Sequence, residues 1–553
     1  MSAHSHRTVL RGGVVVDGTG MPRRRADVEI AGDRIGAIGE VDDRPGDAVV
    51  DATGRFVMPG LIDAHAHVDG RVFDPGVQLA LLRQGVTTVI GGQDGVSYAP
   101  GDGAWASRYF AAINGAHPTY AGGGVAALLA SYDDATPLNV GYLVPAGTVR
   151  HEVMGMQTAR ADAVQLAEMQ RLVAEGLDAG ALGLSTGLDY VPGVFADAEE
   201  LAGLCVPLAS AGALYVTHMR GGYEANTAAG LAEVVAICAA GDRHGGVRGH
   251  VSHLHVDADD AERLLADAAS AGADLTFDMY PYTRGCTLVS MAVLPPEYSA
   301  LDVDDAVARL TDPVERTRLR DAWFPAVADK PSLGPDWPSM IRIGHTPSPE
   351  WAWAPGLTIA EIAGRRGTDV VDATLDLLVA GRLEVNAVMA VRDERPVENL
   401  ARLFALDGHT GGSDGIFVGA VPHPRAAGAF ARMLGTYVGR SFEWEGAAVH
   451  LAARTAERFG LDGRGVLRTG AAADIAIVDP LRVRDAATYD DPGALAVGID
   501  DVFVNGVHVL RDGTLTGARP GRGLRRAGSA AGIHFPSSHP LPLSQPAPAR
   551  HGS

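Results

Sequence analysis

The chain has 553 residues, of which 46% are hydrophobic, so it is long enough for several domains and apolar enough for a large buried core. Its formal net charge of −21 argues against nucleic acid or an anionic membrane surface as a partner, because both are bound through clustered Lys and Arg. The three cysteines are too few for a disulfide framework, and we find no signal peptide and no apolar run of membrane-spanning length. We therefore expect a cytoplasmic protein that acts on a small molecule.

Residues 1–60 are expected to form part of a small β domain. Between residues 7 and 58, short strand-like runs such as "TVLRGGVVVDG" and "AVVDATGRFVMPG" are separated by Gly and Asp turn signals. Strand-like runs return near the other end, in "AADIAIVDP" and in an expected hairpin around "NG" at 500–515. Residues 461–525 are thus predicted to complete a β-sandwich made from both chain ends, followed by a Pro/Ser-rich tail at 526–553 that we expect to be disordered.

The long middle section, residues 61–460, has a different pattern. Apolar strand-like runs such as "GVTTVIGG", "ALYVTHM" and "ADLTFDMYPY" alternate with Ala/Leu-rich helical stretches. This alternation predicts βα units and, with so many of them, a (β/α)₈ TIM-like barrel in an α/β protein. The alternation lapses at about 287–355, in a stretch rich in Pro, Trp and charge. We interpret this stretch as an insertion, and long insertions in barrels often act as lids.

The stretch "GLIDAHAHVDG" places His65 and His67 two residues apart, on the same face of an expected strand. Active sites of barrels form at the carboxyl ends of the strands, so polar residues that end apolar runs are the candidates for chemistry. Six residues meet this criterion: His65, His67, Asp94, His218, His253 and Asp414. Such a set suits one or two Zn²⁺ ions with a position open to water. Each residue taken alone also fits a satisfied core or surface position.

From about residue 7 to 525 the chain resembles the amidohydrolase superfamily, and within it the N-acyl-D-amino-acid deacylases, or D-aminoacylases. The HxH motif in "MPGLIDAHAHVD" marks the superfamily. The segments "GALGLSTGLDYVPG" and "GGSDG" with "HPR" indicate the subgroup, together with "YVTHMRGG", "VSHLH", "DMYPYT" and "GVLRTGAAADIAIVDP". The resemblance implies that His65 and His67 hold one metal site and that His218 and His253 hold another. It also implies that Asp414 is the general base, which takes a proton from water and passes it to the leaving amine.

The chain departs from the family's pattern at Asp94, where the D-aminoacylases carry a metal-binding cysteine. A carboxylated lysine, which bridges the metals of many other amidohydrolases, is hardly available, because the only lysine is Lys330 in the expected insertion. That leaves Asp94 as the candidate bridging ligand, although an Asp before Gly in a loop also fits an Asx turn. Since an oxygen ligand is harder than a thiolate, the preferred metal can shift from Zn²⁺ toward Mn²⁺, Co²⁺ or Fe²⁺.

A second departure concerns substrate binding. The resemblance implies that a tyrosine, an arginine and a lysine hold the substrate carboxylate; Tyr282 and Arg425 match the first two, but His255 occupies the lysine position. Histidine is a weaker, pH-dependent donor, whereas Arg425 keeps a bidentate fork for a carboxylate. Arg284 lies close by in the sequence and either compensates or faces solvent.

The leading hypothesis is a metal-dependent hydrolase that cleaves N-acyl-D-amino acids to a carboxylate and a D-amino acid. The alternative is an amidohydrolase acting on a cyclic amide or imide, a D-amino-acid dipeptide or another acylated amine. A catalytically silent binding protein is the third interpretation.

Overall fold

The computed structural model describes residues 7–222, 224–240, 246–392 and 394–526, so nearly all of the predicted tail lies outside the described residues. Its central sheet has eight strands in the order β19-β15-β14-β13-β12-β11-β10-β8, and every neighbouring pair is parallel. The strands are β8 (Leu61–Asp63), β10 (Val86–Gly91), β11 (Asn139–Pro145), β12 (Gly183–Gly187), β13 (Leu214–His218), β14 (Arg248–Val251), β15 (Leu275–Met279) and β19 (His409–Gly411).

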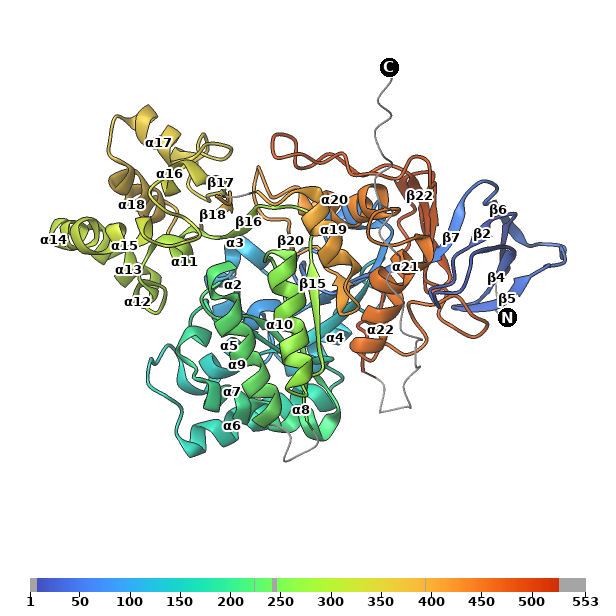
Figure 1. The fold of residues 1–553 in the computed structure, drawn as a ribbon, viewed down its shortest axis with the longest axis horizontal. Coiled ribbons are helices and arrows are strands. Elements are labelled where there is room, and N and C mark those ends of the chain that lie inside the picture. Colours follow the sequence, from blue (N-terminus) through green and yellow to red (C-terminus); the bar gives the residue numbers. More distant parts are fainter. Residues whose placement is uncertain (1–6, 223, 241–245, 393, 527–553) are drawn as a thin grey trace, which may run out of the picture.

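The first and last strands of this sheet meet and close the barrel. The Ala64 N–H donates to the Gly411 carbonyl at 2.9 Å, and the Asp414 N–H donates to the His65 carbonyl at 2.8 Å. Beyond these bonds, β9 (Ala66–His67) pairs in parallel with β20 (Gly415–Ile416). The predicted TIM-like barrel is confirmed (Figure 1).

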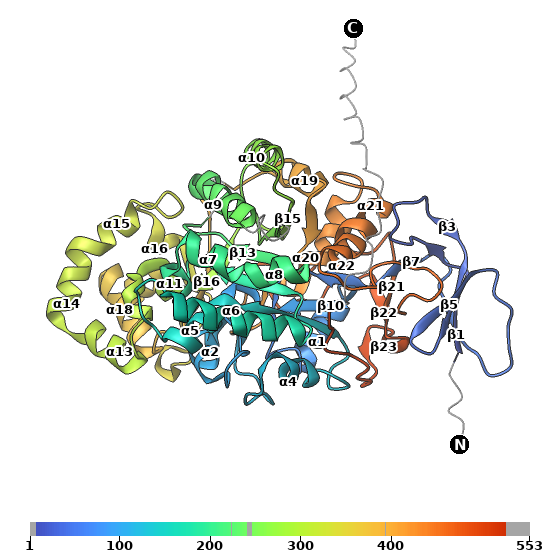
Figure 2. The same ribbon diagram turned by 90° about the horizontal axis from the view of Figure 1, so that it is seen from below.

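Helices surround the barrel strands (Figures 1 and 2). Strands β10 and β11 are buried along their whole length, as expected for strands covered on both faces. The main helices that follow or precede the strands are α1 (Pro75–Leu82), α4 (Gly124–Ala130), α6 (Ala163–Asp178), α7 (Ala198–Leu204), α8 (Val206–Ala211), α9 (Thr227–Ala240), α10 (Ala258–Ser270), α19 (Val397–Ala405), α20 (Arg425–Arg432) and α22 (Arg454–Arg458). Among the described residues, no helix combines the length and the apolar character that crossing a bilayer requires.

Both chain ends contribute to a small β domain at one end of the molecule (Figure 1). One sheet has the order β5-β4-β1-β6, and the other has the order β24-β23-β22-β21-β7-β2-β3. The strands of the first sheet are β1 (Arg7–Arg11), β4 (Asp27–Ala31), β5 (Arg34–Gly39) and β6 (Ala48–Asp51). The strands of the second are β2 (Val14–Val15), β3 (Arg24–Arg25), β7 (Phe56–Pro59), β21 (Ile475–Val478), β22 (Ile499–Val504), β23 (Val507–Arg511) and β24 (Thr514–Leu515).

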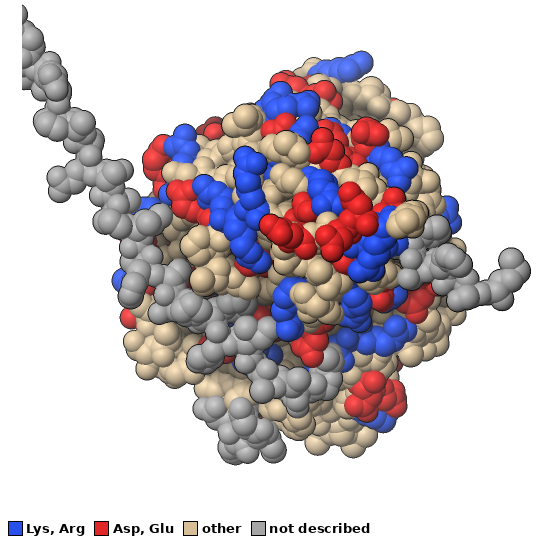
Figure 3. All heavy atoms as spheres, turned by 90° about the vertical axis from the view of Figure 1, so that its right-hand side faces the viewer, with Lys and Arg blue, Asp and Glu red and all other residues tan. Residues whose placement is uncertain are grey.

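One hydrophobic cluster joins the two sheets of this domain. It contains Leu10, Val28 and Ile30 from the first sheet and Ile475 and Phe503 from the second. On the surface at this end, acidic and basic side chains are interspersed (Figure 3). The predicted β-sandwich built from both ends is therefore present.

A separate three-stranded antiparallel sheet interrupts the barrel between β15 and β19. Its order is β16 (Gly285–Leu288), β18 (Asn386–Met389) and β17 (Ile341–His345). Helices cover it, including α11 (Val289–Val293), α13 (Val303–Thr311), α17 (Ile359–Arg366) and α18 (Val370–Ala380), and they form their own core around Trp351. These elements run past residue 355 to Met389, at the opposite end from the β domain (Figure 1). The lid role stays a prediction.

Candidate functional site

His65 and His67 lie where the first barrel strand ends, and both side chains are buried. Each ring is oriented by a partner outside the cluster. His65 Nδ1 lies 3.4 Å from Asp278 Oδ2, and His67 Nδ1 lies 3.0 Å from Asn114 Oδ1. These contacts leave both Nε2 atoms facing the interior of the barrel mouth, where they approach Asp94.

His218 ends β13, and His253 follows β14 on the next strand of the barrel. His218 Nε2 lies 3.2 Å from Asp189 Oδ2, which leaves Nδ1 facing the cluster, 3.2 Å from His253 Nε2. His253 itself has a positive φ of 35°, an uncommon conformation for a residue with a side chain. The structure thus brings the four predicted histidines together, from three strand ends.

Asp94 lies between the two histidine pairs. Its Oδ1 is 3.6 Å from His65 Nε2 and 3.9 Å from His253 Nε2, while its Oδ2 is 3.5 Å from His67 Nε2 and 3.8 Å from His218 Nδ1. The carboxylate therefore contacts all four imidazoles.

The loop that carries Asp94 is tight. Asp94 has φ 54°, and the nearby Gly92 and Gly95 also have positive φ. A Cβ at Gly92 would lie 2.2 Å from the Leu143 carbonyl oxygen, so only glycine fits this approach to the neighbouring strand. The glycines after β10 thus allow the Asp94 side chain to reach the centre of the cluster.

Asp414 lies between β19 and β20, also at a positive φ of 48°. Its Oδ1 is 3.3 Å from His67 Nε2, and its Oδ2 is 2.8 Å from Arg425 Nη2. The preceding Ser413 donates from its N–H and its hydroxyl to Asp63, whose Oδ1 also accepts from the His65 N–H. Asp63 thereby holds the first and last strands in register at the site.

The charges of the cluster depend on one another. Burial lowers the pKa of His67, but hydrogen bonds with Asp414 and Asp94 outweigh it and raise that pKa to about 10. Burial lowers the pKa of His253 to about 4. For Asp414, burial favours the neutral acid, but Arg425 and the histidines hold its pKa well below the usual value. For Asp94, burial is likewise outweighed by the histidines, which lower its pKa. Asp94 and Asp414 therefore both stay ionised at neutral pH.

The donor set fits a metal centre. Two groups of ligand atoms converge within 4.8 Å, His65 with His67 and Asp414, and His65 with Asp94 and His253. His65 Nε2 and Asp94 Oδ1 are buried and have no hydrogen-bond partner within the described residues. Unpaired buried nitrogen and oxygen ligands that face one another are what Zn²⁺ or another divalent transition metal would satisfy.

Arg425 begins α20 and is fully buried beside Asp414. Its guanidinium carbon lies 4.4 Å from the centre of the Tyr280 ring, and its Nε and Nη1 have no hydrogen-bond partner among the described residues. His255 packs against the same tyrosine, with the centroids of the His255 and Tyr280 rings 4.2 Å apart. Burial and the nearby Arg395 lower the pKa of His255 well below its usual value. Arg425 therefore has free donors for an anion.

The other two candidates for substrate binding are engaged elsewhere. The Tyr282 hydroxyl donates to Asp485 at 3.1 Å, and Arg432 stacks on its ring at 4.8 Å. Arg284 stacks on Tyr489 at 4.2 Å and lies 3.5 Å from Glu394. Among the described residues, no hydrogen bond or ring stacking joins Tyr282 to Arg425, so the role of Tyr282 in substrate binding stays a prediction.

The sequence interpretation missed several residues that contact the site. These are Asn114, Asp189, Asp278, Tyr280 and Arg395. Asp278 carried a usable signal, since it interrupts the apolar run of β15 near its carboxyl end. Asn114 ends the short helix α3 (Ala111–Asn114) and Arg395 lies in the loop before α19, and neither follows an apolar strand-like run that could have marked it.

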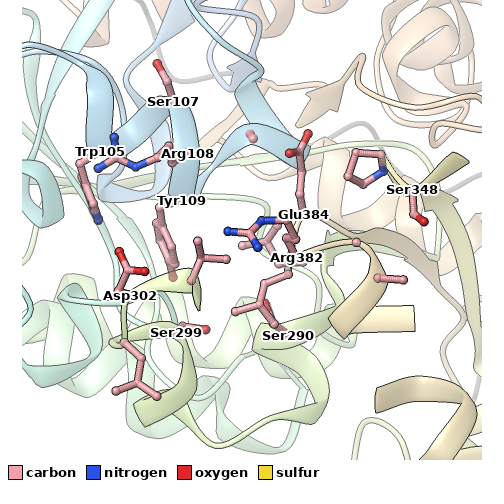
Figure 4. A pocket seen from close by; sticks show the side chains of 18 of the residues that line it. Trp105, Ser107, Arg108, Tyr109, Ser290, Ser299, Asp302, Ser348, Arg382 and Glu384 are labelled. Atoms are coloured by element: carbon pink, nitrogen blue, oxygen red, sulfur yellow. The ribbon is translucent and has the colours of Figure 1, made fainter. Parts of the chain in front are cut away.

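A cavity of about 750 Å³ lies between the barrel and the inserted elements (Figure 4). Trp105, Tyr109, Ser290 and Arg382 line it. Phe110, the residue after Tyr109, packs against His67 with ring centroids 6.1 Å apart. None of the four histidines of the cluster lines this cavity. The candidate metal site is therefore identified by its convergent ligand atoms and not by this cavity.

Comparisons with known proteins agree with this geometry. The model of the amidohydrolase family matches residues 48–513. The N-acyl-D-glutamate deacylase of Alcaligenes xylosoxydans xylosoxydans is 36% identical, over 95% of this chain and 97% of that protein, and the D-aminoacylase of the same organism is 33% identical, over 94% and 97%. The crystal structure of N-acyl-D-glutamate deacylase from Bordetella bronchiseptica, complexed with zinc and a phosphonate inhibitor, has a TM-score of 0.77 at 32% identity and covers 95% of this chain and 100% of that one. The chain therefore belongs to the amidohydrolase family and, within it, to the group of N-acyl-D-amino-acid deacylases.

Proposed function

We propose that the protein is a metal-dependent hydrolase that cleaves the amide bond of N-acyl-D-amino acids to a carboxylate and a D-amino acid. The observation that carries this proposal is the contact of Asp414 with both His67 and Arg425. Asp414, which can accept a proton, therefore lies between His67, a candidate metal ligand, and Arg425, whose Nε and Nη1 can bind an anion. The names of the relatives support the same reaction.

We assign His65, His67, His218, His253 and Asp94 as the residues that would hold the metal, with Zn²⁺ as the first candidate and Mn²⁺, Co²⁺ or Fe²⁺ as alternatives. When bound, such an ion supplies Lewis-acid chemistry, which polarises the scissile carbonyl and makes water acidic enough to lose a proton near neutral pH. Asp94 contacts all four histidines and is the candidate bridging ligand.

Asp414 is the proton carrier in this scheme. As an ionised carboxylate it accepts a proton from the attacking water and delivers it to the nitrogen of the leaving amine, so the departing group is a neutral amine. Its Oδ2 stays on Arg425, which fixes the orientation of the carboxylate while Oδ1 faces His67. Proton transfer is thus left to Oδ1 of Asp414.

Arg425 binds the α-carboxylate of the substrate through its free Nε and Nη1. The α-carboxylate and the scissile nitrogen are attached to the same α-carbon. When Arg425 holds the carboxylate and Asp414 faces the nitrogen, two substituents of this carbon are fixed, and the side chains of the two enantiomers then point in different directions. Such anchoring selects one enantiomer. The free donors of Arg425 favour a free acid over a cyclic amide, an imide or an ester.

The protein is also proposed to act in the cytoplasm on small molecules. Its three cysteines, Cys205, Cys238 and Cys286, are all free, as is usual in a reducing compartment.

The test is Asp414→Asn, assayed with N-acetyl-D-methionine alongside metal analysis. We expect turnover to disappear while bound metal remains at the wild-type level, and Asp462→Asn, an exposed site, to behave as wild type. Retained activity in Asp414→Asn would contradict the assigned role. Hydrolysis of the methyl ester or of dihydropyrimidines in preference to the free acid would favour the alternative substrates. Wild-type protein that binds no metal under any condition would favour a silent binding protein.

A further inference from the structure

The buried side chain of Asn114, at the end of α3, makes two hydrogen bonds with different parts of the candidate metal site. Its Nδ2 group donates to the Val96 carbonyl at 3.2 Å, and its Oδ1 lies 3.0 Å from His67 Nδ1. Val96 belongs to the loop of residues 92–97, which carries Asp94. One amide group therefore contacts a candidate metal ligand and also the loop that carries a second one.

The Val96 carbonyl fixes the direction of this amide. A carbonyl oxygen only accepts, so the NH₂ group of Asn114 must face Val96 and the amide oxygen must face the histidine. The amide oxygen also only accepts, so His67 Nδ1 must carry a proton and donate it. In the neutral ring that binds a metal, the nitrogen without a proton is then Nε2, which lies 3.5 Å from Asp94 Oδ2. Asn114 thus selects the tautomer of His67 that has its lone pair inside the cluster.

The second bond of the amide helps to hold the Asp94 loop. Asp94 has a positive φ of 54°, a conformation that persists only where the surroundings hold it. On one side of Asp94, the Gly92 N–H donates to Asp69 Oδ1 at 2.7 Å. On the other side, the Val96 carbonyl accepts from Asn114. The amide of Asn114 is therefore one of the contacts that keep the Asp94 carboxylate at the centre of the cluster.

The backbone around Asn114 is itself held from two sides. The Tyr98 hydroxyl, just beyond the Asp94 loop, donates to the Gly115 carbonyl at 2.8 Å. From the inserted elements, Asn386 Nδ2 on β18 donates to the Ala112 carbonyl at 2.6 Å. Because both the barrel and the inserted elements fix α3, the Asn114 amide can act as a rigid support for its two partners.

We propose that Asn114 is a positioning residue that couples two metal ligands: its oxygen sets the tautomer of His67, and its NH₂ group holds the loop of Asp94. This inference rests on the proposed function, because it takes His67 and Asp94 as ligands of the metal. Asn114 is not a ligand itself and leaves the chemistry to Asp414.

Two variants separate the two bonds. Asn114→Leu removes both, and we expect affinity for Zn²⁺ to fall about 10–100-fold, the range for lost partners of metal-binding histidines. Asn114→Asp keeps an acceptor for His67 Nδ1 but removes the donor to the Val96 carbonyl. Since Mn²⁺ depends on oxygen ligands more than Zn²⁺ does, loosening Asp94 in this variant should lower the affinity for Mn²⁺ about tenfold relative to that for Zn²⁺. Competition against a chromogenic chelator measures both affinities.

The tautomer of His67 has its own readout in Co²⁺-loaded protein. The Nδ1 proton of a histidine bound to Co²⁺ through Nε2 gives a strongly shifted proton NMR signal, and a hydrogen bond slows its exchange with solvent. We expect one slowly exchanging signal of this kind to disappear in Asn114→Leu and to remain in Asn114→Asp. A general loss of stability would not produce this difference.

The matched control is Asn399→Leu, the same substitution at an asparagine whose Nδ2 donates to Asp257 at 2.8 Å in an exposed bond. It should keep the wild-type affinities and NMR signals. Unchanged Zn²⁺ affinity in Asn114→Leu, an unchanged ratio of the two affinities in Asn114→Asp, or loss of the NMR signal in Asn114→Asp would overturn the coupling by Asn114. The proposed function would then still stand on metal-dependent turnover by the wild type. Wild-type protein that binds none of the three metals would overturn both.

Discussion

Asp278→Asn tests how His65 is oriented toward the metal. The Asp278 carboxylate receives three groups: Oδ1 accepts from the His253 N–H at 2.9 Å, and Oδ2 lies 3.0 Å from His250 Nε2 and 3.4 Å from His65 Nδ1. Asparagine keeps the oxygen for the His253 N–H and replaces Oδ2 with an NH₂ group. An oxygen that faces two imidazoles thus becomes a donor.

The two imidazoles differ in how they can respond. His250 Nδ1 lies 2.8 Å from the Thr276 hydroxyl, which can donate or accept, so His250 can change tautomer. His65 cannot do so, because its Nε2 must stay unprotonated to bind a metal and its proton therefore stays on Nδ1, facing the new NH₂. We expect metal affinity to fall by about 10–100-fold, the range for lost partners of metal-binding histidines. The free energy of unfolding of the metal-free protein should fall by about 1–3 kcal/mol, the cost of a buried group left unsatisfied.

The assay is competition for Zn²⁺ against a chromogenic chelator, with urea unfolding measured on the same metal-free samples. Asp274→Asn is the control, because Asp274 precedes the same strand and pairs with Arg458 at 2.7 Å, away from the histidines. Unchanged metal affinity in Asp278→Asn would refute the assignment of His65 Nε2 as a ligand atom. A loss of stability alone would refute it equally.

Three further predictions concern other parts of the site and the fold. Asp94→Cys should shift relative affinity from Mn²⁺ toward Zn²⁺, because a thiolate is softer than a carboxylate; an unchanged ratio in metal competition would count against Asp94 as a ligand. Asp189→Asn should weaken metal binding about tenfold with little effect on KM, because Asp189 orients His218 at 3.2 Å; equal metal affinity would contradict this. Burial lowers the pKa of His117 to about 4, and its Nδ1 accepts from the Tyr120 N–H. The neutral imidazole therefore contributes to the free energy of unfolding above pH ~6.5, and this contribution is lost as the pH falls toward 4. Urea unfolding should show a loss of about 3 kcal/mol over that window that is absent in His117→Asn, and parallel pH profiles would refute the assignment.

The barrel and its four histidines could be predicted from the sequence because both depend on local periodicity. Alternating apolar runs identify the strands, and the carboxyl ends of parallel strands meet at one edge. His65, His67, His218 and His253 all follow such runs. Asp278 opens the quoted segment "DMYPYT" but was passed over, because the apolar run continues past it to Met279 and does not end at the carboxylate.

The inserted elements show where periodicity stops being informative. The helical runs at 359–380 have the same 3.6-residue pattern as barrel helices, but they pack on the separate sheet β16-β18-β17. Which sheet a helix covers depends on tertiary contacts, and the pattern of one helix does not contain them. The length of the segment outside the barrel was therefore underestimated.

The substrate-binding residues were the hardest to predict, because their partners are distant in sequence. Tyr280 and Tyr282 flank one proline, yet Tyr280 packs against Arg425 while the Tyr282 hydroxyl bonds Asp485, 203 residues away. The pairing of Arg395 with His255 spans 140 residues. Contacts of this kind appear only when the chain is folded.

The most direct test of the central claim is chiral analysis of the products of racemic N-acetylmethionine, after loading the protein with Zn²⁺, Mn²⁺ or Co²⁺. We predict release of D-methionine alone, with N-acetyl-L-methionine left intact and no release from metal-free protein. Release of L-methionine, or no release with any of the three metals, would contradict the assignment of this site as a metal-dependent N-acyl-D-amino-acid deacylase.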